Sequence, residues 1–385
     1  MRRLLLLTSA VVAADTVFFA VLTPLLPHFA HRYGLSKAGA GALVAGYAAG
    51  AFVGALPAGL AAARFGPKRA VLVGLSVTAA ASLGFALATN AWSLGLARVL
   101  QGIGSAFSWA GALAWIIGSA PRERRGELIG ATMGAAVFGA LLGPVLGATA
   151  SVVGIRSAFV TVAGLELALV AWAATMTAAP TEPQPLRDAV AAARNRRLLG
   201  GFWLILLPAL LFGVLMVLVP LRLGDFGWGA VAIGSLFVGV TALEMVMHPL
   251  LGRFADRRGR LLPVRMALAA SIVVSLLLAW AGHPAVIVPL VLAGGLAYGA
   301  FFTPGMAVIS DAADEAGVAQ AIAFGLVNAS WAVGAIAGPS AGGFLADVAG
   351  DAVPYLIMAA VCATTLAFLV PRRSAASQAA PAPDA

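Results

Sequence analysis

Long apolar runs alternate with short polar loops along the whole chain. Twelve runs have the length of about 20 residues that lets an α-helix cross a hydrocarbon core about 30 Å thick. Turn signals such as Gly-Pro and Gly-His-Pro separate them. The pattern predicts a polytopic helical membrane protein with spans at roughly 4–28, 37–62, 69–89, 93–119, 128–150, 157–178, 200–221, 230–252, 263–281, 285–310, 318–345 and 354–371.

The composition agrees with this class. Of the 385 residues, 61% are hydrophobic and only 10% are charged, and a soluble core of this size would not hide so much apolar surface. A transmembrane β-barrel is excluded because its strands are short and alternate apolar with polar residues. The net charge of +9 does not indicate nucleic-acid binding, because the basic residues lie in short loops between spans.

The loops on the two sides of the membrane differ in their basic residues. Of the 24 Lys and Arg residues, nineteen lie at the chain ends and in loops on one side, four lie in loops on the other, and Arg98 lies within a span. Because short loops rich in Lys and Arg stay in the cytoplasm, the count predicts that both termini and the central linker are cytoplasmic.

Two segments of the first half recur in the second. The loop from Gly59 to Arg69 follows the second span, and its counterpart from Gly252 to Arg260 follows the eighth. The run from Gly139 to Gly147 likewise has a counterpart from Gly334 to Gly342. Paired halves of this kind are typical of secondary transporters. We therefore predict an N-terminal six-helix half, a cytoplasmic linker, a C-terminal six-helix half and a disordered tail at residues 1–178, 179–199, 200–373 and 374–385.

The repeated loop resembles the signature G-x-x-x-D-R-x-G-R of the major facilitator superfamily, and the resemblance covers nearly the whole chain. The second copy matches in full, whereas the first has Ala63 where the family usually has Asp. The resemblance implies an all-α polytopic membrane protein with the major-facilitator fold, 12 transmembrane helices as two pseudo-symmetric six-helix halves. It also implies that the loops gate the transporter. Because the first copy lacks the Asp, we expect Asp256 of the second copy to contribute most to stabilising the outward-open state. The glycines permit tight turns. The gating residues are Gly59, Arg64, Gly66, Gly252, Asp256, Arg257, Gly259 and Arg260.

Two further elements resemble parts of the same family. The segment from Arg98 to Gly104 resembles its R-x-x-Q-G-x-G element in the fourth helix. The Gly-Pro element of the fifth span resembles that of the drug–proton antiporters. Glycines four residues apart let a neighbouring helix approach closely, and a proline bends the helix. The residues of this element and of its echo in the eleventh span are Gly139, Gly143, Pro144, Gly147, Gly338 and Pro339.

Four Asp, Glu or Arg side chains lie well inside the predicted spans, where a charge at the centre costs about 2.5–3.5 kcal/mol to insert. Asp15 lies near the middle of the first span and Arg98 near the outer end of the fourth. Both helices line the cavity in the resembled fold, so we expect the two side chains to meet, directly or through water, and to couple transport to protons; a permanent structural ion pair is the alternative. Glu244 is a further coupling candidate with His248 as its partner, or else a packing pair near the inner gate. Glu166 lies in a supporting helix, where we expect structural pairing.

The remaining candidates are polar and aromatic residues on helices that line the cavity of the resembled fold. Aromatic walls beside a carboxylate suit lipophilic cations through charge pairing and cation–π attraction. For each aromatic residue, simple packing is the alternative, and for the two amides it is interhelical hydrogen bonding. The predicted substrate-cavity residues are Phe19, Gln101, Trp109, Phe212, Tyr298, Phe302 and Asn328.

These patterns predict a secondary transporter and no enzyme activity. The chain has no Gly-x-x-x-x-Gly-Lys-Ser/Thr phosphate loop, so we expect no cofactor and a proton gradient as the energy source. We predict proton-coupled efflux of small hydrophobic or cationic compounds, from the inner membrane of a bacterium, by a monomer whose partners are its small-molecule substrate, protons and the lipid bilayer. The alternatives are an exporter of an endogenous metabolite or sugar, a uniporter or importer, and, in last place, a non-transporting receptor.

Overall fold

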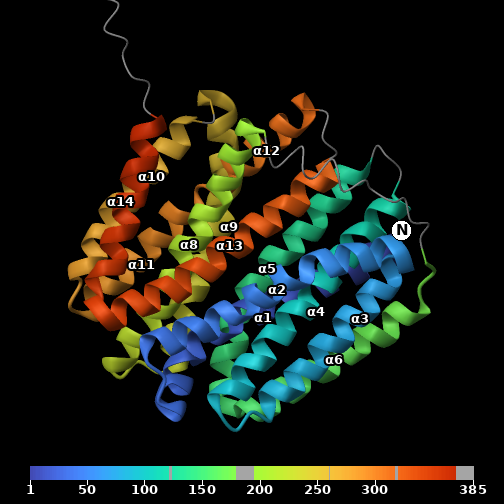
Figure 1. Cartoon of the computed structure of the whole chain (residues 1–385), viewed down its shortest axis with the longest axis horizontal. Coiled ribbons are helices and arrows are strands. Elements are labelled where there is room, and N and C mark those ends of the chain that lie inside the picture. The colour runs from blue at the N-terminus through green and yellow to red at the C-terminus, as the bar shows by residue number, and fades with distance from the viewer. Residues whose placement is uncertain (121–123, 179–194, 260, 317–319, 370–385) are drawn as a thin grey trace, which may run out of the picture.

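The computed structural model describes residues 1–120, 124–178, 195–259, 261–316 and 320–369. These residues form long α-helices joined by short loops (Figure 1). The helices are α1 (Arg2–Tyr33), α2 (Lys37–Phe65), α3 (Pro67–Ala86), α4 (Ala91–Ser119), α5 (Arg125–Val153), α6 (Ile155–Thr175), α8 (Arg196–Asp225), α9 (Ala230–Arg258), α10 (Leu261–Trp280), α11 (Pro284–Gly299), α12 (Phe302–Glu315), α13 (Gln320–Ala349) and α14 (Ala352–Leu369).

The twelve predicted spans are confirmed, since the described residues contain twelve helical stretches that are long and apolar enough to cross a membrane. The tenth differs from the prediction of one continuous helix over 285–310. It is interrupted at Ala300 and Phe301, between α11 and α12. Pro304 explains the break, because proline has no N–H to donate and its ring clashes with the carbonyl four residues earlier, which is that of Ala300.

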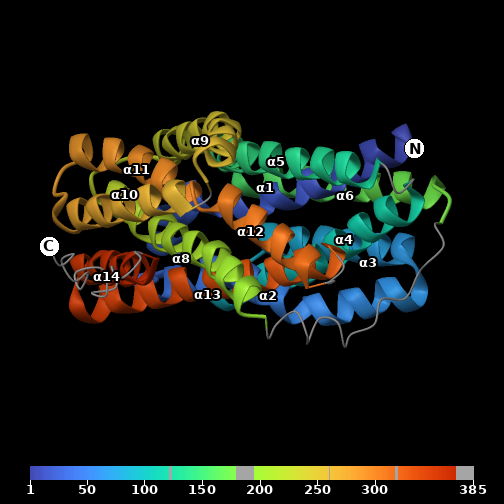
Figure 2. The same ribbon diagram turned by 90° about the horizontal axis from the view of Figure 1, so that it is seen from above.

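Helices α1–α6 and α8–α14 form two groups that lie side by side (Figures 1 and 2). Two helix pairs make the most extensive contacts between the groups, α2 with α13 and α5 with α9, on opposite sides of the assembly (Figure 2). A buried apolar cluster extends from α1 into α8, α9 and α11 and so continues across both groups. Most of the predicted linker 179–199 and all of the tail 374–385 lie outside the described residues, and α8 already begins at Arg196.

Because successive helices alternate in direction, the bundle has two distinct ends. The basic end carries the start of α1 and the loops that follow α2 and α9, with Arg64, Lys68, Arg257 and Arg258. The opposite end carries the starts of α2 and α14. We call it the latch end, because Asp347 and Asp351 of one half bind Lys37 of the other there.

Glycines turn the chain at equivalent places in the two halves. Gly66 ends α2 with φ 90° and ψ 153°, and Gly259 ends α9 with φ 82° and ψ 154°. Gly154, between α5 and α6, and Gly350, between α13 and α14, have φ values of 98° and 93°. L side chains rarely adopt this region. The repeated loop therefore makes the same turn twice.

The Gly-Pro elements also pack alike. A Cβ atom at Gly139 would overlap the Thr16 side chain and the Ala13 carbonyl on α1, and one at Gly338 would overlap the Leu210 carbonyl on α8. Each element therefore lies backbone to backbone against the first helix of its own half.

The proline carbonyls of these elements face the opposite half. A Cβ atom added at Gly234 of α9 would lie 2.9 Å from the Pro144 carbonyl oxygen. The Pro339 carbonyl oxygen lies against Gly41 of α2. One element thus serves packing within a half and contact between halves.

Candidate functional site

A hydrogen-bonded carboxylate lies at the middle of α1. Asp15 is 5% exposed. Its Oδ2 atom accepts hydrogen bonds from the Tyr47 hydroxyl at 2.9 Å, the Ser105 hydroxyl at 2.9 Å and the Trp109 indole Nε1 at 2.5 Å. These donors come from α2 and α4, and all three are neutral. The carboxylate is therefore held by uncharged donors, with no Lys, Arg or His in an ion pair with it among the described residues.

Arg98 on α4 is buried on the other side of Tyr47. Its Nη1 donates to the Phe18 carbonyl at 2.7 Å and to Gln101 Oε1 at 3.1 Å. Its guanidinium carbon lies 5.0 Å from the centre of the Tyr47 ring. The expected meeting of Asp15 and Arg98 therefore takes the form of a shared neighbour, because the Tyr47 hydroxyl donates to the carboxylate while its ring faces the guanidinium.

The polar contacts continue beyond Arg98. Gln101 Nε2 donates to the Ser82 hydroxyl at 3.4 Å, and that hydroxyl donates to Glu166 Oε2 at 3.5 Å. Five helices, α1, α2, α3, α4 and α6, contribute to one buried set of side chains. We call it the polar network; its members are Asp15, Tyr47, Ser82, Arg98, Gln101, Ser105, Trp109 and Glu166.

Aromatic rings connect the polar network to the other half. The Phe19 ring lies 5.8 Å from the Tyr47 ring and 5.0 Å, edge to face, from the ring of Trp331 on α13. Trp331 also packs against Ala48 and Ala335 at the contact between the halves. The site therefore has polar groups from one half and an aromatic neighbour from both.

The candidates of the C-terminal half do not come together in this way. Tyr298 is fully buried; its hydroxyl lies 2.9 Å from Ser275 Oγ, and its ring packs edge to face on Phe212 at 5.8 Å. Phe302 packs in a separate cluster with α8, and Asn328 is exposed.

Glu244 and His248 are not paired with each other. The Glu244 side chain packs against Gly299, where a Cβ would lie 2.5 Å from its Oε1. His248 Nδ1 instead lies 3.1 Å from Thr303 Oγ1.

Four residues of the site were not predicted: Tyr47, Ser82, Ser105 and Trp331. For Ser105 a signal existed, because Arg98, Gln101, Ser105 and Trp109 follow the spacing i, i+3, i+7 and i+11 and so share one face of α4. Ser82 and Trp331 carry no such signal, since a lone serine or tryptophan in an apolar helix is common.

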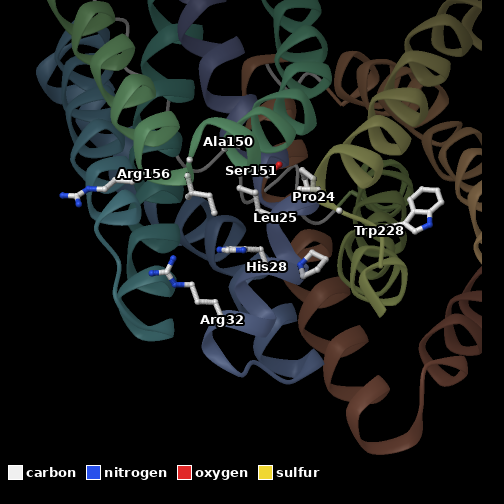
Figure 3. Close-up of a pocket in the computed structure, with 13 residues that line it drawn as sticks. Pro24, Leu25, His28, Arg32, Ala150, Ser151, Arg156 and Trp228 are labelled. Atoms are coloured by element: carbon white, nitrogen blue, oxygen red, sulfur yellow. The ribbon is translucent and has the colours of Figure 1, made fainter. Parts of the chain in front are cut away.

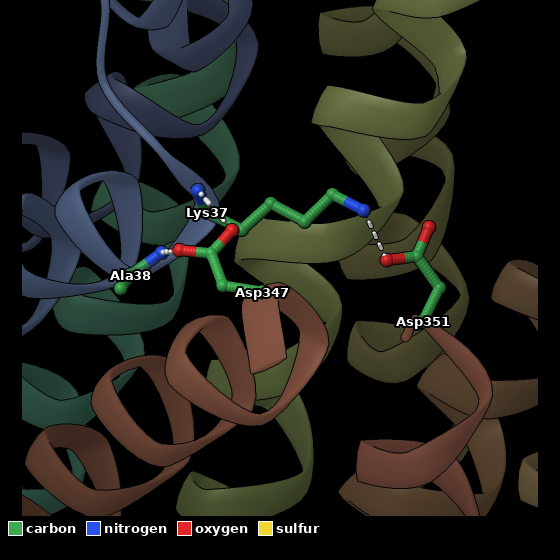
Figure 4. Close-up of polar contacts among 4 residues, drawn as sticks. All are labelled: Lys37, Ala38, Asp347 and Asp351. Atoms are coloured by element: carbon green, nitrogen blue, oxygen red, sulfur yellow. Dashed lines mark hydrogen bonds and ion pairs between the residues drawn. The ribbon is translucent and has the colours of Figure 1, made fainter. Parts of the chain in front are cut away.

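An acidic latch joins the halves far from the polar network (Figure 4). The two carboxylate oxygens of Asp347, on α13, accept hydrogen bonds from the backbone N–H of Lys37 at 3.0 Å and of Ala38 at 2.8 Å. The Lys37 ammonium pairs with Asp351. The carboxylate of one half thus caps the start of α2 in the other, where free N–H groups favour negative charge.

Comparison with known proteins establishes the family. The model of the Major Facilitator Superfamily matches residues 6–324 and 295–384. The chain belongs to the Major Facilitator Superfamily. It is therefore a multi-pass membrane transporter of small molecules from a family of secondary transporters, not of enzymes.

Individual relatives and structures agree. The chain is 30% identical over 400 residues to a chloramphenicol resistance protein of Streptomyces lividans, covering 98% of each chain. It is 28% identical over 166 residues to a probable vesicular acetylcholine transporter of Danio rerio, covering 41% of this chain and 34% of that protein. The crystal structure of a D-xylose–proton symporter superposes with a TM-score of 0.73 at 16% identity, covering 96% of this chain and 97% of that one, and so shares the fold.

The family's loop motif lies at the basic end of this Major Facilitator Superfamily chain. Lys68, in the first copy, donates to the carbonyls of Ala174 and Met176 at 2.6 Å each and so ties the loop to the end of α6. A hollow of about 570 Å³ is lined by Arg64, Lys68 and Arg69. Arg260 and the side chain of Asp256 lie outside the described residues.

A second hollow, of about 600 Å³, opens at the latch end (Figure 3). His28 and Arg32 of α1 lie on one side of it and Trp228, between α8 and α9, on the other. His28 is thirteen residues from Asp15, about 20 Å along a helix that rises 1.5 Å per residue. This hollow is therefore separate from the polar network.

Proposed function

We propose that this transporter exports small hydrophobic or cationic organic compounds in exchange for protons, and that proton and substrate compete for Asp15. The observation that carries the proposal is the environment of this carboxylate. It is buried at mid-helix, hydrogen-bonded only by neutral donors and adjacent to the aromatic side chains of Trp109 and, through Tyr47, Phe19. A carboxylate without an ion-pair partner binds a proton or a cationic substrate more readily than one already neutralised.

The aromatic surroundings support the same class of substrate. Phe19, Trp109 and Trp331 come from α1, α4 and α13 and provide flat apolar surface from both halves. Such surfaces attract cations through the ring faces and neutral aromatic drugs through packing. Chloramphenicol, which names one relative, is a neutral aromatic compound; acetylcholine, which names another, is a quaternary ammonium ion.

The coupling follows from competition at a single group. A proton that enters from outside displaces the substrate from Asp15, and a substrate that binds from inside displaces the proton, so each lowers the affinity for the other by the same factor. The excess of basic residues at one end supports a cytoplasmic location for that end in a bacterial inner membrane. The opposite end, where Asp347 binds the start of α2, would then face the outside of the cell.

The test is transport by the full chain in liposomes with an imposed pH gradient, with chloramphenicol and tetraphenylphosphonium as probes. The wild type should accumulate at least one of them against its gradient, and an uncoupler should abolish the accumulation. Asp15→Asn should abolish it too, while Glu127→Gln, at an exposed position on α5, should transport normally. Transport that survives both the uncoupler and Asp15→Asn would instead indicate a uniporter; no transport of either probe would contradict the substrate class.

A further inference from the structure

We infer that Glu166 is a second proton-binding site of this transporter and that it shares one proton with Asp15 across the Arg98 guanidinium. The inference deepens the proposed function, since it assigns where the coupling proton is held. It rests on the position of Glu166, on its connections and on the charges of the polar network.

The position of Glu166 is unusual for its helix. Its neighbours Leu165 and Leu167 are 62% and 51% exposed, whereas Glu166 is 2% exposed. The side chain therefore points into the bundle while α6 otherwise presents apolar residues outward. A carboxyl group buried at this depth is expensive as an unpaired anion and is found paired or protonated.

Among the described residues, the hydrogen bond of Glu166 leads to the polar network. Ser82 of α3 donates to it at 3.5 Å, and Ser82 in turn accepts from Gln101, whose oxygen accepts from Arg98. Within the described residues Glu166 forms no ion pair. The structural pairing expected for this residue therefore takes the form of a hydrogen bond from Ser82 and not of an ion pair.

The charged groups that face this region are few. Among the described residues of the elements packed around α6, α1 contributes Asp15 and α4, through Gln101, contributes Arg98. The basic residues of α3, Lys68 and Arg69, both lie in its first turn. Lys68 lies against Ala174, which is eight residues beyond Glu166 along α6 and about 12 Å away at 1.5 Å per residue. On α5 the described acid, Glu127, is exposed beyond the span.

The network thus contains two buried carboxyl groups and one buried guanidinium. With both carboxyls ionised its net charge is −1, with both protonated it is +1, and with one proton it is neutral. A buried cluster favours the neutral state, because uncompensated charge in low dielectric is costly. Protonation of Asp15 therefore favours the ionised form of Glu166, and the reverse, so the two groups titrate as a pair.

This sharing gives Glu166 a role in the exchange. When a cationic substrate occupies Asp15, the carboxylate must be ionised, and the proton that leaves it is retained on Glu166 or released, depending on the pH. With the cationic substrate bound, a proton held on Glu166 leaves the occupied site with a net charge of +1, so neutrality favours release of that proton. Without Glu166, the one remaining carboxylate of the network would balance the Arg98 charge, and protonation of Asp15 would leave the network at +1.

The test is the infrared band of protonated carboxyl groups, measured at neutral pH, where exposed carboxyls are ionised. The purified full chain carries Glu244→Gln throughout, so that this half-buried carboxyl within α9 does not contribute to the band. Sharing predicts that Asp15→Asn and Glu166→Gln, added to this parent, each remove most of its band, because the remaining carboxylate is then balanced by Arg98. Arg98→Gln should raise the band about twofold, since both carboxyls become protonated. Glu127→Gln is the control and should leave the band unchanged.

Two outcomes would overturn the inference. If Asp15→Asn leaves the full band in place, Glu166 is protonated independently of Asp15. If Glu166→Gln leaves the band unchanged, Glu166 holds no proton. The measurement requires no substrate, so the inference fails or stands separately from the proposed drug–proton exchange.

Discussion

The two halves of this transporter share their glycine turns and their close helix packing, but they differ in the polar groups that they bury. Gly66 and Gly259 make the same turn, and Gly139 and Gly338 pack in the same way against the first helix of their halves. The N-terminal half, however, encloses a connected network around Asp15, whereas the C-terminal half contains separate pairs such as Tyr298 with Ser275.

The difference indicates which features a two-half transporter needs twice. Both halves must pack closely and meet at the same depth, so the glycine and proline positions are duplicated. A coupling site is needed once, and a second buried ionic network would add the cost of desolvating further charges.

The largest expected effect is loss of Arg98. Arg98→Met leaves Asp15 and Glu166 without their common counter-charge. It also removes the donor from three acceptors, the Phe18 and Phe19 carbonyls and Gln101 Oε1. We therefore expect a loss of about 3–5 kcal/mol in stability. Glu244→Gln, in the other half, removes no hydrogen bond or ion pair found among the described residues and should cost less than about 1 kcal/mol. Thermal unfolding in detergent measures both. Equal losses would mean that the two interiors are energetically alike.

The next effect tests the duplicated packing. Gly139→Val and Gly334→Val each place a side chain against the backbone or side chain of a neighbouring helix, and overpacking of this kind costs about 1–3 kcal/mol. We expect similar losses of unfolding free energy in the two halves. Gly164→Val is the control, because open space surrounds that position on α6. A large loss in one half alone would show that the symmetry of the backbone is not matched by its energetics.

The smallest effect concerns the latch, in which Asp347 of the C-terminal half caps the start of α2 in the N-terminal half. Asp347→Ala removes both acceptors from the start of α2, and a shift of about 1 kcal/mol toward the open latch would change its population about fivefold. The reporter is a cysteine at Ala48, buried at the contact between the halves, in a Cys362→Ser background. Its labelling by a membrane-impermeant maleimide should quicken about fivefold.

The control for the latch is Asp225→Ala, which removes an exposed acid at the same end of the bundle. Its labelling rate should match that of the parent. An Asp347→Ala variant labelled no faster than this control would show that the hydrogen bonds of Asp347 do not hold the halves together.

The sequence alone determined the spans, the paired motifs and the residues that carry charge into the membrane. Twenty apolar residues cross a bilayer whatever they pack against, and a glycine at a turn or a proline within a helix acts through its own backbone. Asp15 and Arg98 were recognisable as candidates for the same reason, since a charge within a span is costly wherever it lies. Pro304 was a signal for the break at Ala300, but the apolar run continues through it, and the prediction followed the apolar run.

Only the tertiary structure decided which of these groups meet. The neighbours of Asp15 are Tyr47, Ser105 and Trp109 rather than Arg98, and Glu166 points inward although its helix is a supporting one. These facts depend on the rotation of each helix about its axis. In a membrane both the lipid and the bundle interior are apolar, so hydrophobic periodicity does not mark the inward face. That rotation is fixed by close contacts between particular helices, such as those of the α5 glycines with α1, which form only when the chain is assembled.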